Sequence, residues 1–361
     1  MITLSRRDVL KAAASVAAFG TGLSGLRFPV AEAAETITAM EWGDTYISAI
    51  KQIASKQTDV DINWQLHAGG SAAILPKIKA TWPNSGIDLL TGWDVSWQII
   101  AREGWAEPVT LEQVPNLADI PEKLLVRDGG GNIINIPRTL SAFFWYYRED
   151  AAPFEITKID DLLDPRLAGK IVFPSPSLNS NMQIVGLALA KGGDERNMEP
   201  GWDFVKKLAQ SGNIGRVANT GSDIGPSLDS GETCVTFEGG SGAVERGRRY
   251  KIRSLSKMAP ETGFKTFLFQ EGWCVLKGPH KDAAMKFANF GIDPENNAEF
   301  NRSIGGVPVN VKSAASDELK PMLFNNEEAE KYAYIPDWSY VSEQADAWNK
   351  RWEQEVVPLL R

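Results

Sequence analysis

Short apolar segments alternate with amphipathic ones along the first third of the chain. Thr36–Trp42, Val60–Leu66 and Ile87–Leu90 have the apolar or alternating pattern of strands, and each is followed by a segment with helical spacing of its apolar residues. This β-α-β-α-β order is typical of a mainly parallel sheet whose faces are covered by helices. In such sheets, ligands bind beyond the carboxyl ends of the strands.

A second series of the same kind follows further along the chain. Its predicted strands are Lys170–Phe173, Ile214–Ala218 and Cys234–Phe237, and its predicted helices are Asn179–Lys191, Trp202–Ala209 and Ser222–Ser230. Pro226 fits the last of these helices only if it lies in the first turn. A long helix from Ser339 to about Val357 is predicted at the C-terminus.

The segment between the two series is the most distinctive of the sequence. Ile136–Asp150 contains five consecutive aromatic residues, Phe143–Tyr147, which favour a strand buried on both faces. We interpret it as a crossover between two lobes, with Phe264–Leu276 carrying the chain back. The predicted fold class is therefore α/β with two lobes, each a mainly parallel sheet flanked by helices, and with a ligand-sized cleft between them.

The N-terminus has the features of an export signal. Ser5–Lys11 is close to a twin-arginine motif, an Ala/Gly-rich apolar run follows, and Ala31-Glu32-Ala33 matches a cleavage site. An amphipathic first helix is the alternative interpretation. We expect residues 1–33 to be a signal peptide, cleavage to follow Ala33, and the mature protein to be periplasmic.

The charge of the mature chain bears on its partners. Removing residues 1–33 takes away four basic and two acidic residues, which leaves 34 basic against 44 acidic residues and a net charge of −10. An acidic protein repels nucleic acid and anionic lipid and mildly favours a cationic ligand. We expect no nucleic-acid partner.

The chain has two cysteines, Cys234 and Cys274. Export permits a disulfide between them. Such a bridge would join the second lobe to the strand that returns to the first, and would restrict a hinge. Two buried free thiols are the interpretation we favour, and the disulfide stays open as the alternative.

Motifs for catalysis or metal binding are weak. Gly239–Ala243 resembles a nucleophile elbow around Ser241, but it ends in Ala, and the chain has only two histidines, His67 and His280. These histidines and two distant cysteines make no recognisable metal site. Adjacent tyrosines, Tyr146-Tyr147, would point to opposite faces of a strand and would not meet one ion. We predict neither an enzyme nor a cofactor, and an exported serine hydrolase using Ser241 is the rival class.

Aromatic and acidic residues occur together at the predicted sheet edges and crossovers. The four pairs are Trp42 with Asp44, Trp93 with Asp94, Phe237 with Glu238, and Phe269 with Glu271. An ammonium group in a cleft needs carboxylates to offset lost hydration, and aromatic faces add cation–π attraction. The Gly-rich turns around Gly70-Ser71 and Gly239–Ser241 offer backbone N–H groups to a polar ligand group. The pattern suits a small amine.

The chain resembles the periplasmic solute-binding proteins of ABC importers, in the spermidine/putrescine group. The motifs that carry the resemblance are Trp42-Gly43-Asp44, Asp160–Pro165 with Gly169-Lys170, Gly231-Glu232, and Ile304-Gly305 followed by Pro308 and Asn310. The resemblance implies a monomer with a type II fold that closes over its ligand and delivers it to an inner-membrane permease. It also implies that 34–140 and 270–315 form one lobe, and 141–269 and 316–361 the other.

Several positions depart from the polyamine binders. Ser180 and Gln183 fall where those proteins tend to have carboxylates, and Gly306 falls where they have tyrosine. Arg216 or Arg138 could bind the carboxylate of a zwitterion such as a γ-amino acid if it faces the cleft. A structural salt bridge is the alternative role for both arginines. The ligand therefore stays open between a polyamine and a zwitterionic amine, and an anion or iron receptor is a further alternative.

Overall fold

The computed structural model describes residues 34–67, 71–256, 263–319 and 331–360, with the backbone alone for 71–73. The predicted signal peptide lies outside these residues. The fold below is that of the compact unit Glu35–Arg361.

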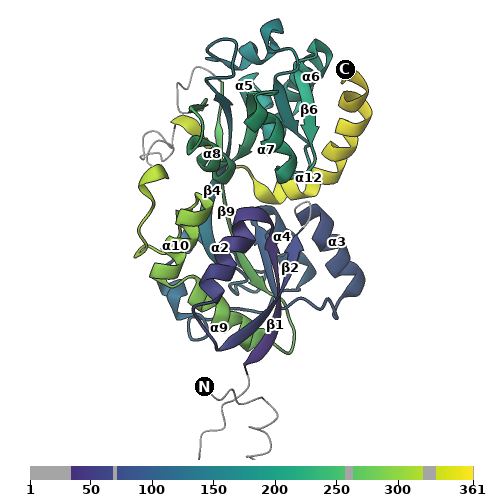
Figure 1. Ribbon diagram of the computed structural model, residues 1–361. Coiled ribbons are helices and arrows are strands. Elements are labelled where there is room, and N and C mark those ends of the chain that lie inside the picture. The colour runs from purple at the N-terminus through teal and green to yellow at the C-terminus, as the bar shows by residue number, and fades with distance from the viewer. Residues whose placement is uncertain (1–33, 68–70, 257–262, 320–330, 361) are drawn as a thin grey trace, which may run out of the picture. The chain divides into compact units, whose positions relative to one another are not determined.

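The first strand-helix series forms a parallel set of three strands. They are β1 (Glu35–Trp42), β2 (Val60–His67) and β3 (Leu89–Trp93), and the helices that follow them are α2 (Asp44–Ala54), α3 (Ser71–Thr81) and α4 (Asp94–Glu103). Ile50 and Ile53 are buried on one side of α2, as the helical spacing predicts. The later helix α9 (Lys281–Gly291) also packs on β1 and β2, and α10 (Pro294–Ile304) packs against α2 (Figure 1).

The second series forms another parallel set. Its strands are β5 (Ile171–Pro174), β6 (Ile214–Ala218) and β7 (Val235–Gly239), and its helices are α5 (Met182–Ala190), α6 (Glu199–Ser211), α7 (Gly221–Ser230) and α8 (Gly240–Gly247). The shorter 3-10 segments of the chain are Pro115–Asp119, Glu122–Leu124, Ile159–Leu163, Pro165–Leu167 and Asp317–Leu319.

Two long antiparallel strands join the two sets. These are β4 (Ile136–Arg148), which contains the aromatic run, and β9 (Thr266–Val275). They lie at the centre of a single 11-stranded sheet with the order β2-β1-β3-β9-β4-β7-β5-β6. Three short strands, β8 (Ile252–Ser254), β10 (Val307–Pro308) and β11 (Ala333–Tyr334), pair with β4 or β9. The predicted crossover and return strands are confirmed.

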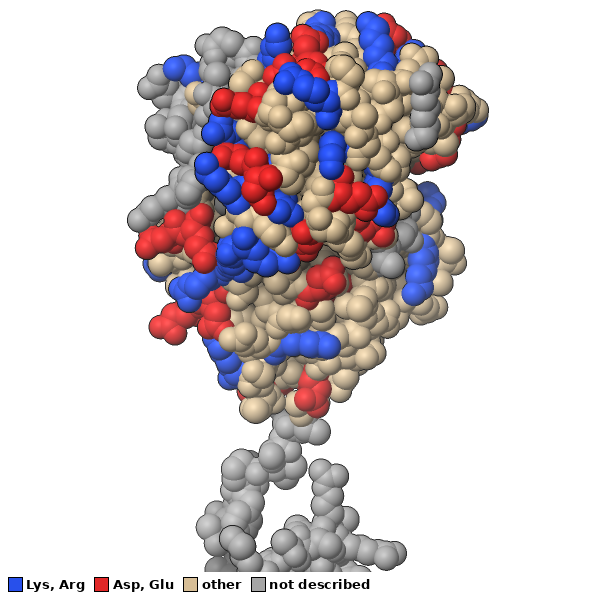
Figure 2. All heavy atoms as spheres, turned by 45° about the horizontal axis from the view of Figure 1, so that its top comes forward, with Lys and Arg blue, Asp and Glu red and all other residues tan. Residues whose placement is uncertain are grey.

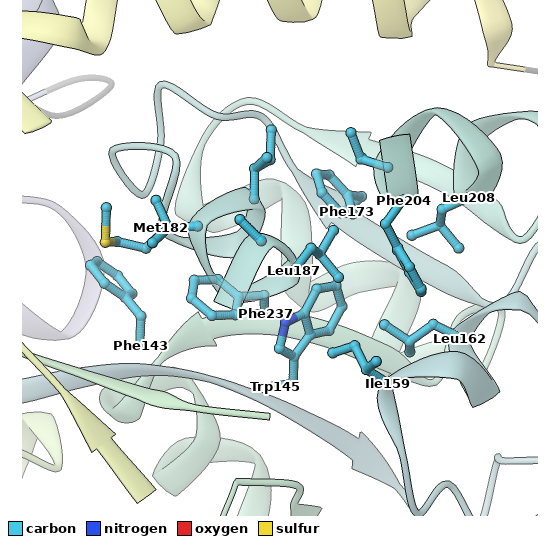
Figure 3. Close-up of a cluster of buried hydrophobic side chains, with 14 of the residues drawn as sticks. Phe143, Trp145, Ile159, Leu162, Phe173, Met182, Leu187, Phe204, Leu208 and Phe237 are labelled. Carbon is cyan, nitrogen blue, oxygen red and sulfur yellow. The ribbon is translucent and has the colours of Figure 1, made fainter. Parts of the chain in front are cut away.

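The aromatic run divides between the two faces of β4. Phe143, Trp145 and Tyr147 belong to one buried cluster, whereas Phe144 and Tyr146 belong to another. Figure 3 shows Trp145 among Phe237, Ile159 and Leu162 in the larger of these clusters. The two tyrosines therefore point apart, as expected for neighbours on a strand.

Both cysteines are free and fully buried, in agreement with the interpretation we favoured. Cys234 lies in the cluster of Trp145, and Cys274 lies in a different cluster with Trp97 and Trp105. Burial raises the pKa of the Cys234 thiol to about 11, so it stays protonated and unreactive near neutral pH.

The C-terminal helix is shorter than predicted. Helix α12 covers Trp338–Arg351, and a π-helical turn at Trp352–Val356 and a 3-10 turn at Val357–Leu359 follow it. The Trp352 ring stacks on Phe173, with ring centroids 5.4 Å apart and planes only 6° from parallel. This contact fixes the end of the chain against the second set of strands.

Two local predictions were wrong. Pro226 lies in the middle of α7 and not in its first turn, so the helix lacks one internal N–H at that point. Helix α5 begins three residues later than predicted, at Met182, because Ser180 and Asn181 have positive φ angles of 48° and 64° that a helix does not accept. In addition, α10 was not predicted at all.

Among the described residues, no helix is both long and apolar enough to cross a bilayer.

We predict that Gly272→Ala destabilises the fold through the β4–β9 pairing. A Cβ atom at this position would lie 2.2 Å from the Ile136 carbonyl oxygen, and the strand backbone cannot move away without breaking the ladder. We expect a loss of about 2 to 4 kcal/mol in the free energy of unfolding, measured by urea denaturation. Gly129→Ala is the control, because a Cβ there meets nothing within 4 Å. Equal urea midpoints for the two variants would contradict the close approach.

Candidate functional site

The antiparallel pairing of β3 with β9 brings four of the predicted site residues together. Trp93 is directly opposite Glu271, and Asp94 follows at the start of α4 beside Gln270. Phe269 lies on the same strand, with its ring centroid 5.4 Å from that of Trp93 in an edge-to-face arrangement. Two of the four aromatic-acid pairs therefore lie next to each other.

Trp93 is the centre of an aromatic group in this region. Besides Phe269, its ring makes edge-to-face contacts with Phe143 of β4, at 5.7 Å, and with Trp338 of α12, at 5.4 Å. Phe143 and Phe269 stack on each other at 4.4 Å. Residues from four distant parts of the sequence thus meet at the end of β3. Trp338 is a member that the sequence did not single out.

Asp94 is buried, with 9% of its surface exposed. Its Oδ2 accepts a hydrogen bond of 2.8 Å from the backbone N–H of Gln270. Burial raises the pKa of Asp94 to about 6, and the Gln270 hydrogen bond only partly opposes this. The carboxylate therefore holds the start of α4 against β9 and still carries an uncompensated charge at neutral pH.

Glu271 is the most unusual acid in the site. Its side chain is 4% exposed, and its Oε1 has no hydrogen-bond partner among the described residues. Burial raises its pKa to about 7, against the attraction of the Arg138 guanidinium. The side chains of Tyr46 and Trp42 also oppose the rise in the pKa of Glu271.

Arg138 does not neutralise Glu271, because a second acid already holds it. Its two terminal nitrogens donate to Glu41 at 2.6 and 3.1 Å, and both side chains are completely buried. The guanidinium also lies over the rings of Trp273 and Phe300, at 4.6 and 4.1 Å from their centroids. The structural salt bridge is therefore the correct reading for Arg138.

Trp42 and Asp44 flank the site at the end of β1. The Trp42 ring stacks on His67 at 4.0 Å, and the Nε2 atom of His67 lies 2.9 Å from the Thr91 carbonyl oxygen. Asp44 is exposed and begins α2 with a left-handed φ of 53°. Its side chain is thus at the rim, whereas Tyr46, two residues later, reaches Glu271.

Tyr46 was missed by the sequence analysis. Burial and then the Glu271 carboxylate raise the pKa of its phenol well above the ordinary value, and Arg138 and the Ser241 hydroxyl oppose this. The Tyr46 ring packs edge-to-face on Phe300 of α10, with ring centroids 5.9 Å apart. The only feature of the sequence that could have indicated Tyr46 as a site residue is its position in the first turn of a predicted helix, close to Asp44.

Glu238 is placed differently from the prediction, since its charge is compensated within the protein. It accepts a hydrogen bond from the Tyr146 hydroxyl at 2.5 Å and one from Arg246 at 3.2 Å. Burial raises the pKa of Glu238, and Arg246 opposes the rise. A Cβ at Gly242 would lie 2.3 Å from this carboxyl group, which explains the glycine. The Gly-rich turn at 239–242 thus packs over a structural ion pair.

The remaining candidates do not join the site in the described structure. Arg216 is exposed on β6 and makes a two-pronged ion pair with Glu232, at 3.0 and 2.8 Å. Gly70 lies outside the described residues, and Ser71 is described only as the first backbone position of α3. His280 pairs with Glu35, at the far end of β1 from Trp42, and does not approach Ser241.

Metal ligands do not gather in the described part of the chain, where no three His, Cys, Asp or Glu side chains are placed to hold one ion. On the face shown in Figure 2, Lys and Arg side chains alternate with Asp and Glu side chains. Many of these form surface pairs, such as Arg248 with Glu318 and Arg249 with Asp229. Asp94 of α4 and Glu271 of β9, by contrast, are buried.

Comparison with known proteins identifies the class. Residues 48–330 match the model of a family described as bacterial extracellular solute-binding protein. The chain belongs to this family. Its family and two-lobed type II fold are those of substrate-binding components of ABC transporters, which bind a solute outside the cell and present it to a permease.

Similar proteins differ in the ligands that their names state. The iron uptake protein A1 of Synechocystis sp. is 23% identical over 286 residues, which is 73% of this chain and 74% of that protein. The spermidine/putrescine substrate-binding protein PotD of Streptococcus pneumoniae has 16% identity, a TM-score of 0.66, and coverage of 88% of this chain and 99% of its own. Iron-bound HitA of Pseudomonas aeruginosa has 17% identity, a TM-score of 0.65, and coverage of 88% and 98%. These structures show the fold of this solute-binding protein.

We predict that Glu271→Gln stabilises the unliganded protein at neutral and higher pH. The folded-state pKa of about 7 lies above the ordinary value of 4.5, so the folded protein holds a proton that the unfolded chain has released between these pH values. Stability is therefore lost as the pH rises from 4.5 through 7. The glutamine variant avoids this loss, which amounts to about 3 kcal/mol at pH 8.

The measurement is urea denaturation of both proteins at pH 4.5 and pH 8. Glu112→Gln is the matched control, because Glu112 is exposed. A glutamine variant that is less stable than the wild type at pH 8 would show that Glu271 is compensated in the folded protein.

Proposed function

We propose that this solute-binding protein captures a small organic amine, with the ammonium group placed beside Glu271. The observation that carries the proposal is the uncompensated buried carboxylate, whose Oε1 has no partner among the described residues. A buried acid without a partner is costly, and proteins retain such groups mainly at functional sites.

The charges around Glu271 favour a cation. Glu41 and Arg138 cancel each other in a buried pair, which leaves the ionised Glu271 as a net negative charge. Asp94 adds a second buried acid at the adjoining end of α4. An ammonium ion would restore neutrality, and each added ring contact supplies roughly 0.5 to 2 kcal/mol. Trp42, Tyr46 and Trp93 are the aromatic residues placed to make such contacts.

The proposal includes the transport cycle that the family suggests. The two lobes, with the boundaries given above, would close over the amine, and the protein would deliver it to its permease as a periplasmic monomer. The sheet order supports this, because β9 and β4 connect the first set of strands to the second. Asp44, at the rim, would contribute long-range attraction more than direct contact.

We predict that Glu271→Gln abolishes or strongly weakens amine binding. Calorimetric titration of the mature protein with putrescine, γ-aminobutyrate and 4-aminobutanol should show binding of at least one of them, and the variant should bind it at least about 30-fold more weakly. Glu112→Gln should bind as the wild type does. Phosphate and ferric citrate are control ligands. Heat from ferric citrate alone, with none from any amine, would refute the proposal.

Amine affinity should also depend on pH with a defined sign. Because the ammonium group favours the ionised carboxylate, binding must displace the proton that Glu271 holds below pH 7. Affinity should fall roughly tenfold per pH unit below that value, more steeply below pH 6 where Asp94 also protonates. Titrations at pH 7 in buffers of different ionisation enthalpy should show proton release on binding. An affinity that is constant from pH 5 to 8 would place the ammonium group elsewhere.

A further inference from the structure

A cavity of 260 Å³ lies in the first set of strands, away from the proposed amine site. It is formed by the loop before β2, the 3-10 helix Pro115–Asp119 and the second half of α9, and we call it the α9 cavity. Val60, the first residue of β2, lines it, whereas Trp42 and His67 lie at the other end of β1 and β2. Figure 1 shows α9 beside the start of β1. The 8 residues of β2 separate the two ends by about 23 Å, so the α9 cavity is not part of the site beside Glu271.

Two asparagines join the walls of the α9 cavity. The backbone N–H of Asn116 donates to Asn289 Oδ1 at 2.9 Å, and Asn116 Nδ2 donates to the Asn289 carbonyl oxygen at 3.0 Å. These bonds fix both amide groups and use one polar atom of each. Asn116 Oδ1 and Asn289 Nδ2 have no hydrogen-bond partner among the described residues. Both residues line the cavity, so these two atoms are available to an occupant.

The charges that line the α9 cavity do not balance. Lys286 of α9 pairs with Asp59, and their nitrogen and oxygen atoms are 2.9 Å apart. Asp293 caps the N-terminus of α10, because its Oδ1 accepts the N–H of Glu295 at 3.1 Å. The Oδ2 of Asp293 has neither a hydrogen bond nor an ion pair with any described residue. One negative charge therefore remains at the cavity, and it favours a cation.

Aromatic side chains form the apolar part of the α9 cavity. Phe287 and Phe290 of α9 line it, and Phe290 is only partly buried. Aromatic rings attract cations and stack on planar cationic groups. The Lys286 and Asp59 side chains are 61% and 60% exposed, so the cavity opens to solvent where they lie. A group of this kind can therefore enter from solution.

We infer that the α9 cavity binds a guanidinium group. This ion is planar, keeps its charge at physiological pH and carries five N–H donors in a fixed fork. The fork suits two acceptors on separate elements, Asp293 Oδ2 and Asn116 Oδ1, while its face contacts Phe290. An ammonium group is a compact point charge and suits such divided acceptors less well. Asn289 Nδ2 is left for water or for a carbonyl oxygen of the molecule that carries the guanidinium group. The inference does not depend on the amine site.

The test is an NMR titration of the isotope-labelled mature protein with methylguanidinium, followed at the side-chain amide signals of Asn116 and Asn289. We expect saturable shifts of both signals below about 20 mM. Methylammonium should bind at least about threefold more weakly, and acetate should not bind. These signals are local to the cavity, so binding beside Glu271 does not contribute to them.

Two substitutions should change the affinity for methylguanidinium in opposite directions. Asp293→Asn should weaken binding at least about fivefold, because asparagine still caps α10 but lacks the charge. Lys286→Met should tighten binding about twofold, because it leaves Asp59 unpaired. Asp282→Asn is the matched control and should bind as the wild type does, since Asp282 is an exposed acid of α9 that does not line the cavity.

Three results would overturn the inference. They are the absence of saturable shifts, equal affinities of the Asp293→Asn and Asp282→Asn variants, and binding of methylammonium or acetate that is as tight as that of methylguanidinium. The wild-type ranking of the three ligands decides the matter if a variant fails to fold.

A further ligand identifies the source of the guanidinium group. It is a blocked peptide with one arginine between two glycines, and its carbonyl oxygens can reach Asn289 Nδ2. Binding of the peptide that is tighter than that of methylguanidinium would assign the cavity to an arginine side chain of a partner protein. Exclusion of the peptide, with methylguanidinium still bound, would assign it to a free guanidinium solute.

Discussion

The pairing of β4 with β9 is the constraint on which the rest of the structure depends. Both strand sets are hydrogen-bonded to this pair, β3 to β9 and β7 to β4, so the two strands carry every element that contributes to the site. Gly272, next to Glu271, allows a close approach between them. The same ladder places Trp93 opposite Glu271 and aligns Phe143 with the aromatic group. The location of the acid is therefore a consequence of strand register more than of any local motif.

Charge distribution within the site explains why a binding protein would retain a destabilising residue. Arg138 is near enough to Glu271 to attract it, yet its guanidinium is bound on both prongs by Glu41 and covered by two rings. A fully compensated carboxylate would gain little from a cationic ligand. A carboxylate with one unpaired oxygen would gain more, because a cation next to that oxygen reduces the cost of its burial. If an ammonium group binds beside Glu271 as proposed, the stability lost through the burial of this carboxylate would return as affinity.

Much of the fold could be predicted from the sequence, because alternating strands and helices and the run Phe143–Tyr147 are local patterns. The acids were harder to interpret. Glu238 directly follows Phe237, and Glu271 comes two residues after Phe269, but only the structure shows that Tyr146 and Arg246 compensate Glu238. Arg246 is eight residues from Glu238 and meets it only because α8 folds back over β7. Tyr46 and Trp338 were missed because their contacts join segments that are far apart in the sequence. Local motifs identify candidate residues, whereas long-range pairing decides which of them remain free.

The two buried thiols give the molecule a pair of independent chemical reporters. Cys234 and Cys274 lie in different hydrophobic clusters, and no disulfide links them. A thiol reagent can modify each only when its own cluster opens, so the two labelling rates record the opening of two parts of the core separately. If binding of a solute makes the two clusters open together, both labelling rates would fall. If the two clusters still open independently, only one labelling rate would fall. The coupling between the two strand sets can thus be measured through the native cysteines, with no engineered labelling site.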